Sequence, residues 1–326
     1  MSRLVLVTGA TGFAGSHVVD ALLAAGHRVR VPVRASSDPR WLPDGVERMR
    51  ADLRDPDGLR PLVRGASWIF HFAGITRAAR REEFHRVNAA GTRDLYRAAG
   101  EAGGDLELFV FCSSLAASGP SPSAEAPRRE ADPPAPVTAY GRSKLEAEDW
   151  LRENRKAGTR LLVVRPPAVY GPRDTAVLAL FRWAAAGFLP LPAPRGNRLT
   201  LIHARDLAAA CLFLADGGRE GVFHVGDGGL HSWEKVGESL GRLLKRRLRA
   251  IRIPGALMRV LGIYGDLAAV VTGRVPVINR DKVADLRRPY WIACIDKLTA
   301  TGYLPQIGLE EGLQETVSWY RAEGWL

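Results

Sequence analysis

A glycine-rich turn near the start of the chain constrains its fold more than any other feature. The apolar run Leu4–Thr8 reads as a β-strand, and Gly9, Gly12 and Gly15 follow it in Gly-x-x-Gly-x-x-Gly spacing before a helical pattern that reaches Ala25. Glycines at such a junction permit a tight turn and let the backbone approach a pyrophosphate, while the helix N-terminus attracts negative charge. A glycine turn alone is weak evidence, but this strand–turn–helix context predicts a dinucleotide-binding unit.

Strand-like and helix-like segments alternate beyond this turn. Further strands are expected at 28–33, 46–50, 67–71, 106–112 and 160–165, and helices near 57–63, 82–101 and 140–156. Such alternation predicts a parallel sheet with right-handed crossovers. We therefore expect an α/β fold, in which a Rossmann-type, doubly wound parallel sheet over residues 1–165 carries a smaller, mostly helical C-terminal substrate lobe. Residues 166–198 and 217–326 are assigned to the lobe, and 199–216, a strand at 199–202 followed by a helix, is expected to rejoin the main sheet.

Composition narrows the class of protein. No apolar run approaches about 18 residues, so no transmembrane segment is expected, and the N-terminus runs directly into a strand without a signal-peptide pattern. The three cysteines are widely spaced and show no metal-ligand pattern, which indicates a cytoplasmic protein and predicts no metal site. The net charge of +11 comes without a nucleic-acid-binding motif, so anionic small molecules are favoured over nucleic acid as partners.

Tyr140 and Lys144 are the first candidate catalytic residues. They lie four apart on an expected helix, so their side chains share one face. A phenol has a pKa near 10 and is a poor acid–base catalyst at neutral pH, and a neighbouring ammonium lowers that pKa. The pair follows the glycine turn at the distance of five β/α units, and we expect Tyr140 to exchange a proton with the oxygen of a carbonyl or alcohol.

Several further blocks appear in a familiar order. They are Asp52-Leu53-Arg54-Asp55, His71-Phe72-Ala73-Gly74, Val87-Asn88-Ala89-Ala90-Gly91-Thr92, Tyr140-Gly141-Arg142-Ser143-Lys144, Arg165-Pro166-Pro167-Ala168-Val169-Tyr170-Gly171-Pro172 and Ile202-His203-Ala204-Arg205-Asp206-Leu207. Together with the glycine turn, they resemble the extended short-chain dehydrogenase/reductase family, also called the NAD-dependent epimerase/dehydratase superfamily. The resemblance covers nearly the whole chain. Within the family, the sequence is similar to dihydroflavonol-reductase-like and hydroxysteroid-dehydrogenase-like members.

The resemblance implies a set of cofactor-binding residues. Asp52 and Leu53 would border the adenine, Ala73 and Gly74 would lie beside the ribose and phosphates, and Pro166 to Val169 would approach the nicotinamide. The remaining implied contacts come from the glycine turn and from the catalytic pair: Gly9, Thr11, Gly12, Phe13, Gly15, Tyr140 and Lys144.

The end of the second strand distinguishes between the two nicotinamide cofactors. An acidic residue there would bind a ribose 2′-hydroxyl, whereas an arginine pairs with a 2′-phosphate. This chain has Val33 and Arg34 at that place and no acid until Asp38. Arg34 therefore favours NADP, and NAD remains possible.

The resemblance adds two residues to the catalytic set. Ser114, after the fifth strand, would hydrogen-bond the reacting oxygen, and Asn88 would support the active-site helix and its water. Family members that dehydrate nucleotide sugars carry an Asp-Glu pair directly after the catalytic hydroxyl. Here those positions are Leu115 and Ala116, which have no proton to give, so a dehydratase reaction is disfavoured.

Three functions remain open at this point. The first is an NAD(P)-dependent ketone reductase or alcohol dehydrogenase; the second is a nucleotide-sugar epimerase with tightly bound NAD; the third is a non-enzymatic dinucleotide-binding redox sensor. Substrate specificity is expected from the proline-rich loop 119–137, from 172–198, where Arg173, Arg195 and Arg198 could bind a diphosphate or be solvated surface charges, and from the C-terminal lobe. The basic, then apolar, segment 241–263 could be an interfacial membrane helix or an ordinary lobe helix, and helices 82–101 and 140–156 could form a homodimer.

Overall fold

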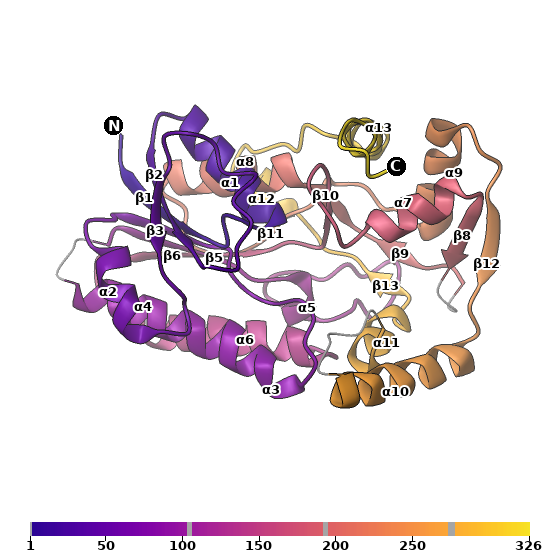
Figure 1. Ribbon diagram of the computed structural model, residues 1–326, viewed down its shortest axis with the longest axis horizontal. Coiled ribbons are helices and arrows are strands. Elements are labelled where there is room, and N and C mark those ends of the chain that lie inside the picture. Colours follow the sequence, from indigo (N-terminus) through magenta and orange to yellow (C-terminus); the bar gives the residue numbers. More distant parts are fainter. Residues whose placement is uncertain (1, 103–105, 192–194, 273–277) are drawn as a thin grey trace.

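A parallel β-sheet forms the centre of the computed structural model, which describes residues 2–102, 106–191, 195–272 and 278–326 (Figure 1). Within those residues it has seven strands in the order β11-β6-β5-β4-β1-β2-β3. Strand order reverses beside β1, which is the doubly wound topology, so the predicted α/β fold is confirmed. The strands are β1 (Leu4–Thr8), β2 (Arg28–Val33), β3 (Glu47–Arg50), β4 (Trp68–His71), β5 (Leu108–Cys112), β6 (Arg160–Arg165) and β11 (Gly221–His224).

Helices cover both faces of this sheet (Figure 1). α1 (Phe13–Ala24) and α8 (Ala204–Asp216) pack on one face, and α2 (Pro56–Val63), α4 (Gly91–Glu101) and α6 (Ala139–Glu153) pack on the other. Successive residues of a strand point to opposite faces, and here both faces are buried. Val5 and Val7 therefore belong to one core cluster and Leu6 to the other.

The helix expected at 82–101 consists of three pieces. α3 (Arg81–Phe84) leads into a π-helical turn, η1 (His85–Ala90), which continues as α4. π-Turns inside helices are frequent at functional sites, and this one carries Asn88.

The C-terminal lobe has its own small core between α7, α9 and α13. Its helices are α7 (Leu178–Ala185), α9 (Trp233–Leu244), α10 (Gly255–Thr272), α11 (Arg280–Leu286), α12 (Asp296–Thr299) and α13 (Leu309–Ala322), whereas the short helix α5 (Leu115–Ser118) follows β5 in the sheet domain. Its strands are β7 (Ala168–Tyr170), β8 (Phe188–Leu191), β9 (Arg198–Leu199), β10 (Leu201–His203), β12 (Arg249–Arg252) and β13 (Tyr290–Trp291). In the described residues these strands form the two-stranded parallel pairs β10–β7, β12–β8 and β13–β9.

One expectation about the sheet is wrong. The strand predicted at 199–202 is β9 and β10, which pair with β13 and β7 outside the main sheet, although α8 does pack on that sheet. The seventh strand is instead β11, within the segment assigned to the lobe. Pro166 and Pro167 end β6, so the chain leaves the sheet there and returns only at Gly221.

The proline-rich loop 119–137 is irregular, as predicted, and packs against the C-terminal segment. The backbone N–H of Ser121 donates to the Tyr290 carbonyl at 2.9 Å, and that of Arg128 donates to the Ile292 carbonyl at 3.0 Å. Among the described residues, no helix has the length and apolar character needed to cross a bilayer.

Candidate functional site

The glycine turn joins β1 to α1 in a conformation that requires glycine. Gly9 has a φ of +73°, and a Cβ on it would lie 2.6 Å from the Ala73 nitrogen at the end of β4. A Cβ on Gly15 would lie 2.2 Å from the Gly9 carbonyl oxygen, so Gly15 lets the helix approach the turn. In the described structure, no side chain caps the start of α1, and its first turn has no acid. Its free N–H groups therefore suit a pyrophosphate.

The other predicted cofactor residues follow the carboxyl ends of neighbouring parallel strands. Arg34 follows β2, and Asp52 and Leu53 follow β3. Ala73 and Gly74 follow β4, and Pro166 begins the turn after β6, with Val169 in β7. Ligands of doubly wound sheets bind at this edge, next to the reversal of strand order. The structure thus brings these residues to the edge where a dinucleotide fits.

Arg34 and Asp52 are electrostatically coupled. The side-chain hydrogen bond from Arg54, with the Arg34 charge as a further contribution, lowers the pKa of Asp52 to about 2. Arg34 is exposed, and its own backbone N–H donates to the Ser37 hydroxyl at 3.2 Å. Its guanidinium therefore remains accessible to an anionic group at the end of β2.

Tyr140 and Ser114 meet at the end of β5. Thr138 caps α6 by accepting a 2.9 Å hydrogen bond from the Gly141 N–H, which places Tyr140 in the first turn. The Ser114 hydroxyl accepts a 3.1 Å hydrogen bond from the Ala116 N–H, so its own hydrogen is left for another acceptor. Burial raises the pKa of the Tyr140 phenol above its usual range, and the Ser114 hydroxyl beside the phenol opposes that shift.

Lys144 is buried one helical turn beyond Tyr140, and its ammonium points elsewhere. Its Nζ donates to the Cys112 carbonyl at 2.8 Å and lies 4.8 Å from the centre of the Phe111 ring. Burial lowers the pKa of Lys144. The expectation that this ammonium depresses the pKa of Tyr140 is therefore wrong for this arrangement, because desolvation of the phenol dominates. A Cβ on Gly74 would lie 3.2 Å from Nζ, so the ammonium borders the predicted cofactor loop.

Asn88 fastens the loop after β4 to α6. Its side-chain oxygen accepts from the Ile75 N–H at 2.8 Å, and its Nδ2 donates to the Ile75 carbonyl and to the Ser143 hydroxyl, both at 3.0 Å. These bonds hold Gly74 and the catalytic helix in one frame. In the described structure no hydrogen bond links Asn88 to Tyr140, so Asn88 is a positioning residue.

A buried charged network below the site was not predicted. Glu148, on α6, and Arg165, at the end of β6, form an ion pair whose side chains are 0% and 4% exposed. The Glu148 carboxylate also accepts from the Ser113 hydroxyl, and Arg165 donates to the Ser118 hydroxyl at 3.0 Å. An available signal was that Glu148 lies four residues after Lys144, on the buried face of the same helix.

Asp281 is a second residue that sequence reasoning missed. Its carboxylate accepts hydrogen bonds from the backbone N–H groups of Ala139 at 2.8 Å and Tyr140 at 3.4 Å. It comes from α11, far along the chain, and no local pattern connects it to α6. The C-terminal lobe thereby holds the N-terminal end of the catalytic helix.

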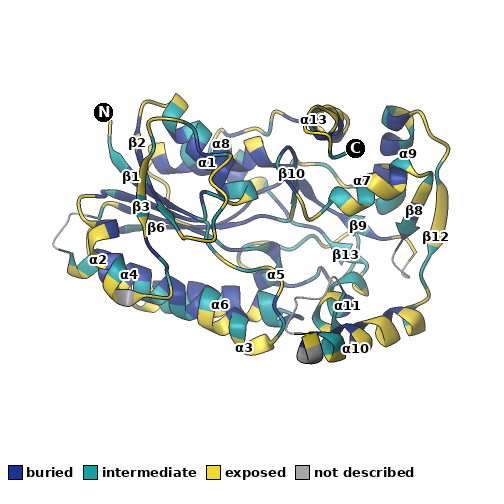
Figure 2. Ribbon diagram, in the orientation of Figure 1, coloured by how far each residue is buried: buried dark blue, intermediate teal, exposed yellow. Residues whose placement is uncertain are grey.

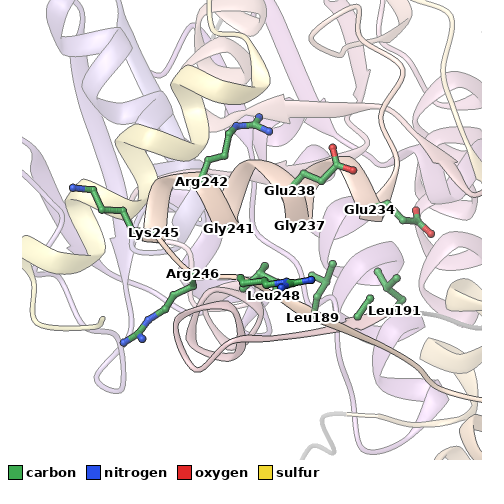
Figure 3. Close-up of a pocket in the computed structure, with 12 residues that line it drawn as sticks. Leu189, Leu191, Glu234, Gly237, Glu238, Gly241, Arg242, Lys245, Arg246 and Leu248 are labelled. Atoms are coloured by element: carbon green, nitrogen blue, oxygen red, sulfur yellow. The ribbon is translucent and has the colours of Figure 1, made fainter.

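The arginines predicted to bind a diphosphate and a surface groove both lie apart from this site. Arg173 pairs with Asp20 of α1 at 2.8 Å, and Arg198 donates to the Asn197 carbonyl, so the structure does not bring them together as a diphosphate clamp. A groove of about 680 Å³ runs between α9 and the β8–β12 pair, and no predicted site residue lines it (Figure 3). Over the described residues, no cluster of three or more His, Cys, Asp or Glu side chains could hold a metal.

The fold and the site define a class. Rossmann-type oxidoreductases typically have a doubly wound sheet with a glycine turn at its first crossover. This chain has that sheet and turn, with a tyrosine, a lysine and a serine at the carboxyl edge. Residues 5–226 match the NAD dependent epimerase/dehydratase family, and the chain belongs to this family.

Relatives within the family have different activities. The chain is 33% identical to the ceramide reductase of Caulobacter vibrioides, over 99% of this chain and 96% of the relative. It is 31% identical to the sterol demethylase protein B of Methylococcus capsulatus, over 80% of each. The Thermus thermophilus UDP-glucose 4-epimerase, solved in complex with NAD, superposes with a TM-score of 0.79 at 25% identity, over 98% of this chain and 99% of that one.

Proposed function

We propose that this protein is an NAD(P)-dependent oxidoreductase that transfers hydride between the nicotinamide and a ketone or secondary alcohol. The observation that carries the proposal is that Tyr140 and Ser114 lie beside one another at the carboxyl edge of the sheet, next to Leu115 and Ala116. Tyr140 and Ser114 can bind and protonate a carbonyl oxygen. Leu115 and Ala116 supply no acid or base for the loss of water.

Each side chain has a defined part in the reaction. The dinucleotide, when bound, supplies or accepts the hydride. Ser114 donates a hydrogen bond to the carbonyl oxygen, and Tyr140 gives its proton to that oxygen as negative charge develops there. Because burial raises the pKa of Tyr140, the phenol stays protonated at neutral pH, which suits the direction of reduction. Lys144, whose Nζ borders Gly74, would help to hold the dinucleotide, and Asn88 keeps that loop in register with α6.

NADP is the proposed cofactor. Arg34 stands exposed where β2 ends and has no acidic residue beside it in the sequence to bind a 2′-hydroxyl. In titrations of the full chain, we expect tighter binding of NADPH than of NADH, and Arg34→Ala should remove most of this preference. Arg28→Ala is the matched control, because Arg28 is exposed at the opposite end of the same strand. No preference in the wild type would refute NADP as the cofactor, and an unchanged preference for NADPH in Arg34→Ala would refute Arg34 as its determinant.

The names of two relatives support an apolar substrate. Ceramide and sterols are lipids, so a ketone on a lipid is the proposed substrate class. The decisive assay is oxidation of NADPH with a panel of long-chain ketones, sterol ketones and UDP-sugars. Tyr140→Phe should reduce turnover about 10²- to 10⁴-fold without weakening cofactor binding. Full turnover in Tyr140→Phe would refute the mechanism.

A nucleotide-sugar epimerase is the second candidate, favoured by the likeness to the epimerase solved with NAD. It would use the same Tyr140, Lys144 and Ser114, because epimerisation also passes through a ketone. An epimerase keeps its cofactor through the catalytic cycle. Denaturing the purified protein and finding one NAD⁺ per chain would therefore favour the epimerase over the reductase, and turnover of either kind would exclude a non-enzymatic redox sensor.

A further inference from the structure

Helix α10 displays large apolar side chains to solvent. Half of the large hydrophobic residues that are exposed in the described structure lie on this helix: Leu257, Val260, Leu261, Ile263, Tyr264 and Leu267. Val260, Tyr264 and Leu267 are 62%, 70% and 60% exposed and follow one another at helical spacing, so they share one face. Solvent-facing helix sides are normally polar, and contiguous exposed apolar surface marks an interaction site.

The opposite side of α10 is narrow and made mostly of small residues. Met258, Gly262, Gly265 and Ala269 are buried at i, i+4, i+7 and i+11. A Cβ on Gly262 would lie 2.9 Å from the Val283 side chain of α11, so the two helices touch closely along this stripe. The burial pattern therefore turns the bulky side chains outward. Figure 2 shows the exposed side of α10 along the outer edge of the molecule.

The surroundings of α10 are strongly basic. Between residues 245 and 288 the sequence has 11 Lys and Arg against three Asp, and one of the three, Asp266, pairs with Arg280. The strand β12 runs down one side of the molecule from the end of α9 and leads into α10 (Figure 1). In the described part of the chain, no carboxylate pairs with the exposed side chains of Arg259, on α10, or of Arg287 and Arg288, just after α11.

Helix α10 is connected to the catalytic residues through α11. α10 packs on α11, and α11 carries Asp281, whose carboxylate binds the backbone N–H groups of Ala139 and Tyr140. A partner that binds α10 would therefore contact the lobe that supports the catalytic helix.

We propose that α10 docks on the surface of an anionic lipid bilayer, with its exposed apolar face among the acyl chains and the neighbouring basic side chains on the headgroups. An interfacial helix needs an apolar face and positive charge beside it, and this segment has both. A second copy of the chain would have to place two sets of like charges together. The docking stands independently of the proposed reaction, and it explains how a reductase of this kind would reach a lipid ketone.

The test is sedimentation of the full chain with vesicles, without substrate. Vesicles of phosphatidylcholine with phosphatidylglycerol should bind the protein, and pure phosphatidylcholine vesicles should bind much less. Raising the salt concentration should weaken the binding, because it screens the basic side chains. Val260→Gln with Leu267→Gln should lower the partition coefficient about tenfold or more, because two exposed apolar side chains are removed from the lipid-facing side.

Leu230→Gln with Leu304→Gln is the matched control. These two leucines are 55% and 62% exposed outside α10, and their replacement should leave vesicle binding unchanged. Thermal melting of both double variants should match the wild type, which separates docking from misfolding. Absence of binding to the anionic vesicles, or equal loss in both double variants, would overturn the proposal. So would a wild-type dimer that the α10 variant converts to monomer, because the apolar face would then join two copies.

The result is separable from the proposed reaction. Tyr140→Phe should bind vesicles as the wild type does, because its side chain is not on the docking face. If vesicle binding fails while a water-soluble ketone is still reduced, docking is wrong and the proposed function survives. If vesicle binding holds while no ketone is reduced, the proposed function fails instead.

Discussion

The buried ion pair between Glu148 and Arg165 offers a quantitative test of how the site is held. Arg165 directs its Nε and one terminal nitrogen to the two carboxylate oxygens of Glu148, at distances of 2.6 to 3.2 Å. The substitution Glu148→Gln keeps the size and shape of the side chain and removes its charge. An arginine stays protonated in proteins, so the variant would leave the positive charge of Arg165 buried without a counter-ion.

Breaking one partner of a buried pair costs about 3–5 kcal/mol, because the remaining charge is uncompensated. The glutamine still accepts one hydrogen bond from Arg165, so we expect the lower end of that range. For a chain of this size, about 2 °C is lost per kcal/mol, which predicts a melting temperature about 6 °C lower. The double variant Glu148→Leu with Arg165→Met removes both charges and should recover most of the loss.

Urea unfolding followed by circular dichroism measures the free energy of unfolding, and thermal unfolding measures the melting temperature. Glu146→Gln is the control on the same helix: Glu146 pairs with His85 at the surface, and its loss should change stability by less than about 0.5 kcal/mol. If Glu148→Gln costs less than about 1 kcal/mol, or if the double variant is less stable than the single one, then the buried pair does not stabilise the site in the way argued here.

Three further predictions concern single side chains. Alanine in place of Asp281 should lower the stability by about 1 kcal/mol, as for a lost helix cap; if the carboxylate positions Tyr140, kcat also falls while the cofactor Kd holds, and an unchanged kcat would contradict this role. The Tyr140 phenol stays protonated to high pH, so ketone reduction should be flat between about pH 6 and 9 while alcohol oxidation rises; a rate of reduction that falls across this range would contradict it. Burial raises the pKa of Asp174 to about 6, so its ionisation destabilises the fold as the pH rises from about 4 to 6; the free energy of unfolding of Asp174→Asn should therefore exceed that of the wild type by roughly 2–3 kcal/mol at pH 7, and no difference at pH 7 would refute this.

The sequence predicted the parts of the site that local patterns encode. The turn at Gly9, Gly12 and Gly15 could be recognised because a strand and a helix flank it, and Tyr140 and Lys144 because helical spacing places them on one face. The direction in which Lys144 points is not local. Its Nζ binds the Cys112 carbonyl at the end of β5, and the desolvation that raises the pKa of Tyr140 comes from elements far along the chain. Neither can be read from the spacing of two residues.

The same limit explains why the strand assignment failed beyond residue 165. β11 has four residues, Gly221–His224, and short apolar runs of that kind also occur at 199–203, so periodicity could not decide which one joins the sheet. The choice depends on a tertiary fact: β6 offers a free edge along Leu162–Arg165, and β11 pairs with it in parallel register. The prolines at 166 and 167 indicate where the chain leaves the sheet, but not where it comes back.

The sequence of α10 shows that this segment is apolar, but it does not show which side of the helix is buried. The sequence has large apolar residues around most of this helix, which is typical of a helix buried on all sides. Gly262 decides otherwise, because only a small residue allows its close contact with α11, and the bulky residues must then face away from it. A helix that packs through small residues and exposes its leucines presents an apolar surface of the kind that marks an interaction site. The bilayer surface proposed above is a cover whose charge matches the basic residues beside that helix.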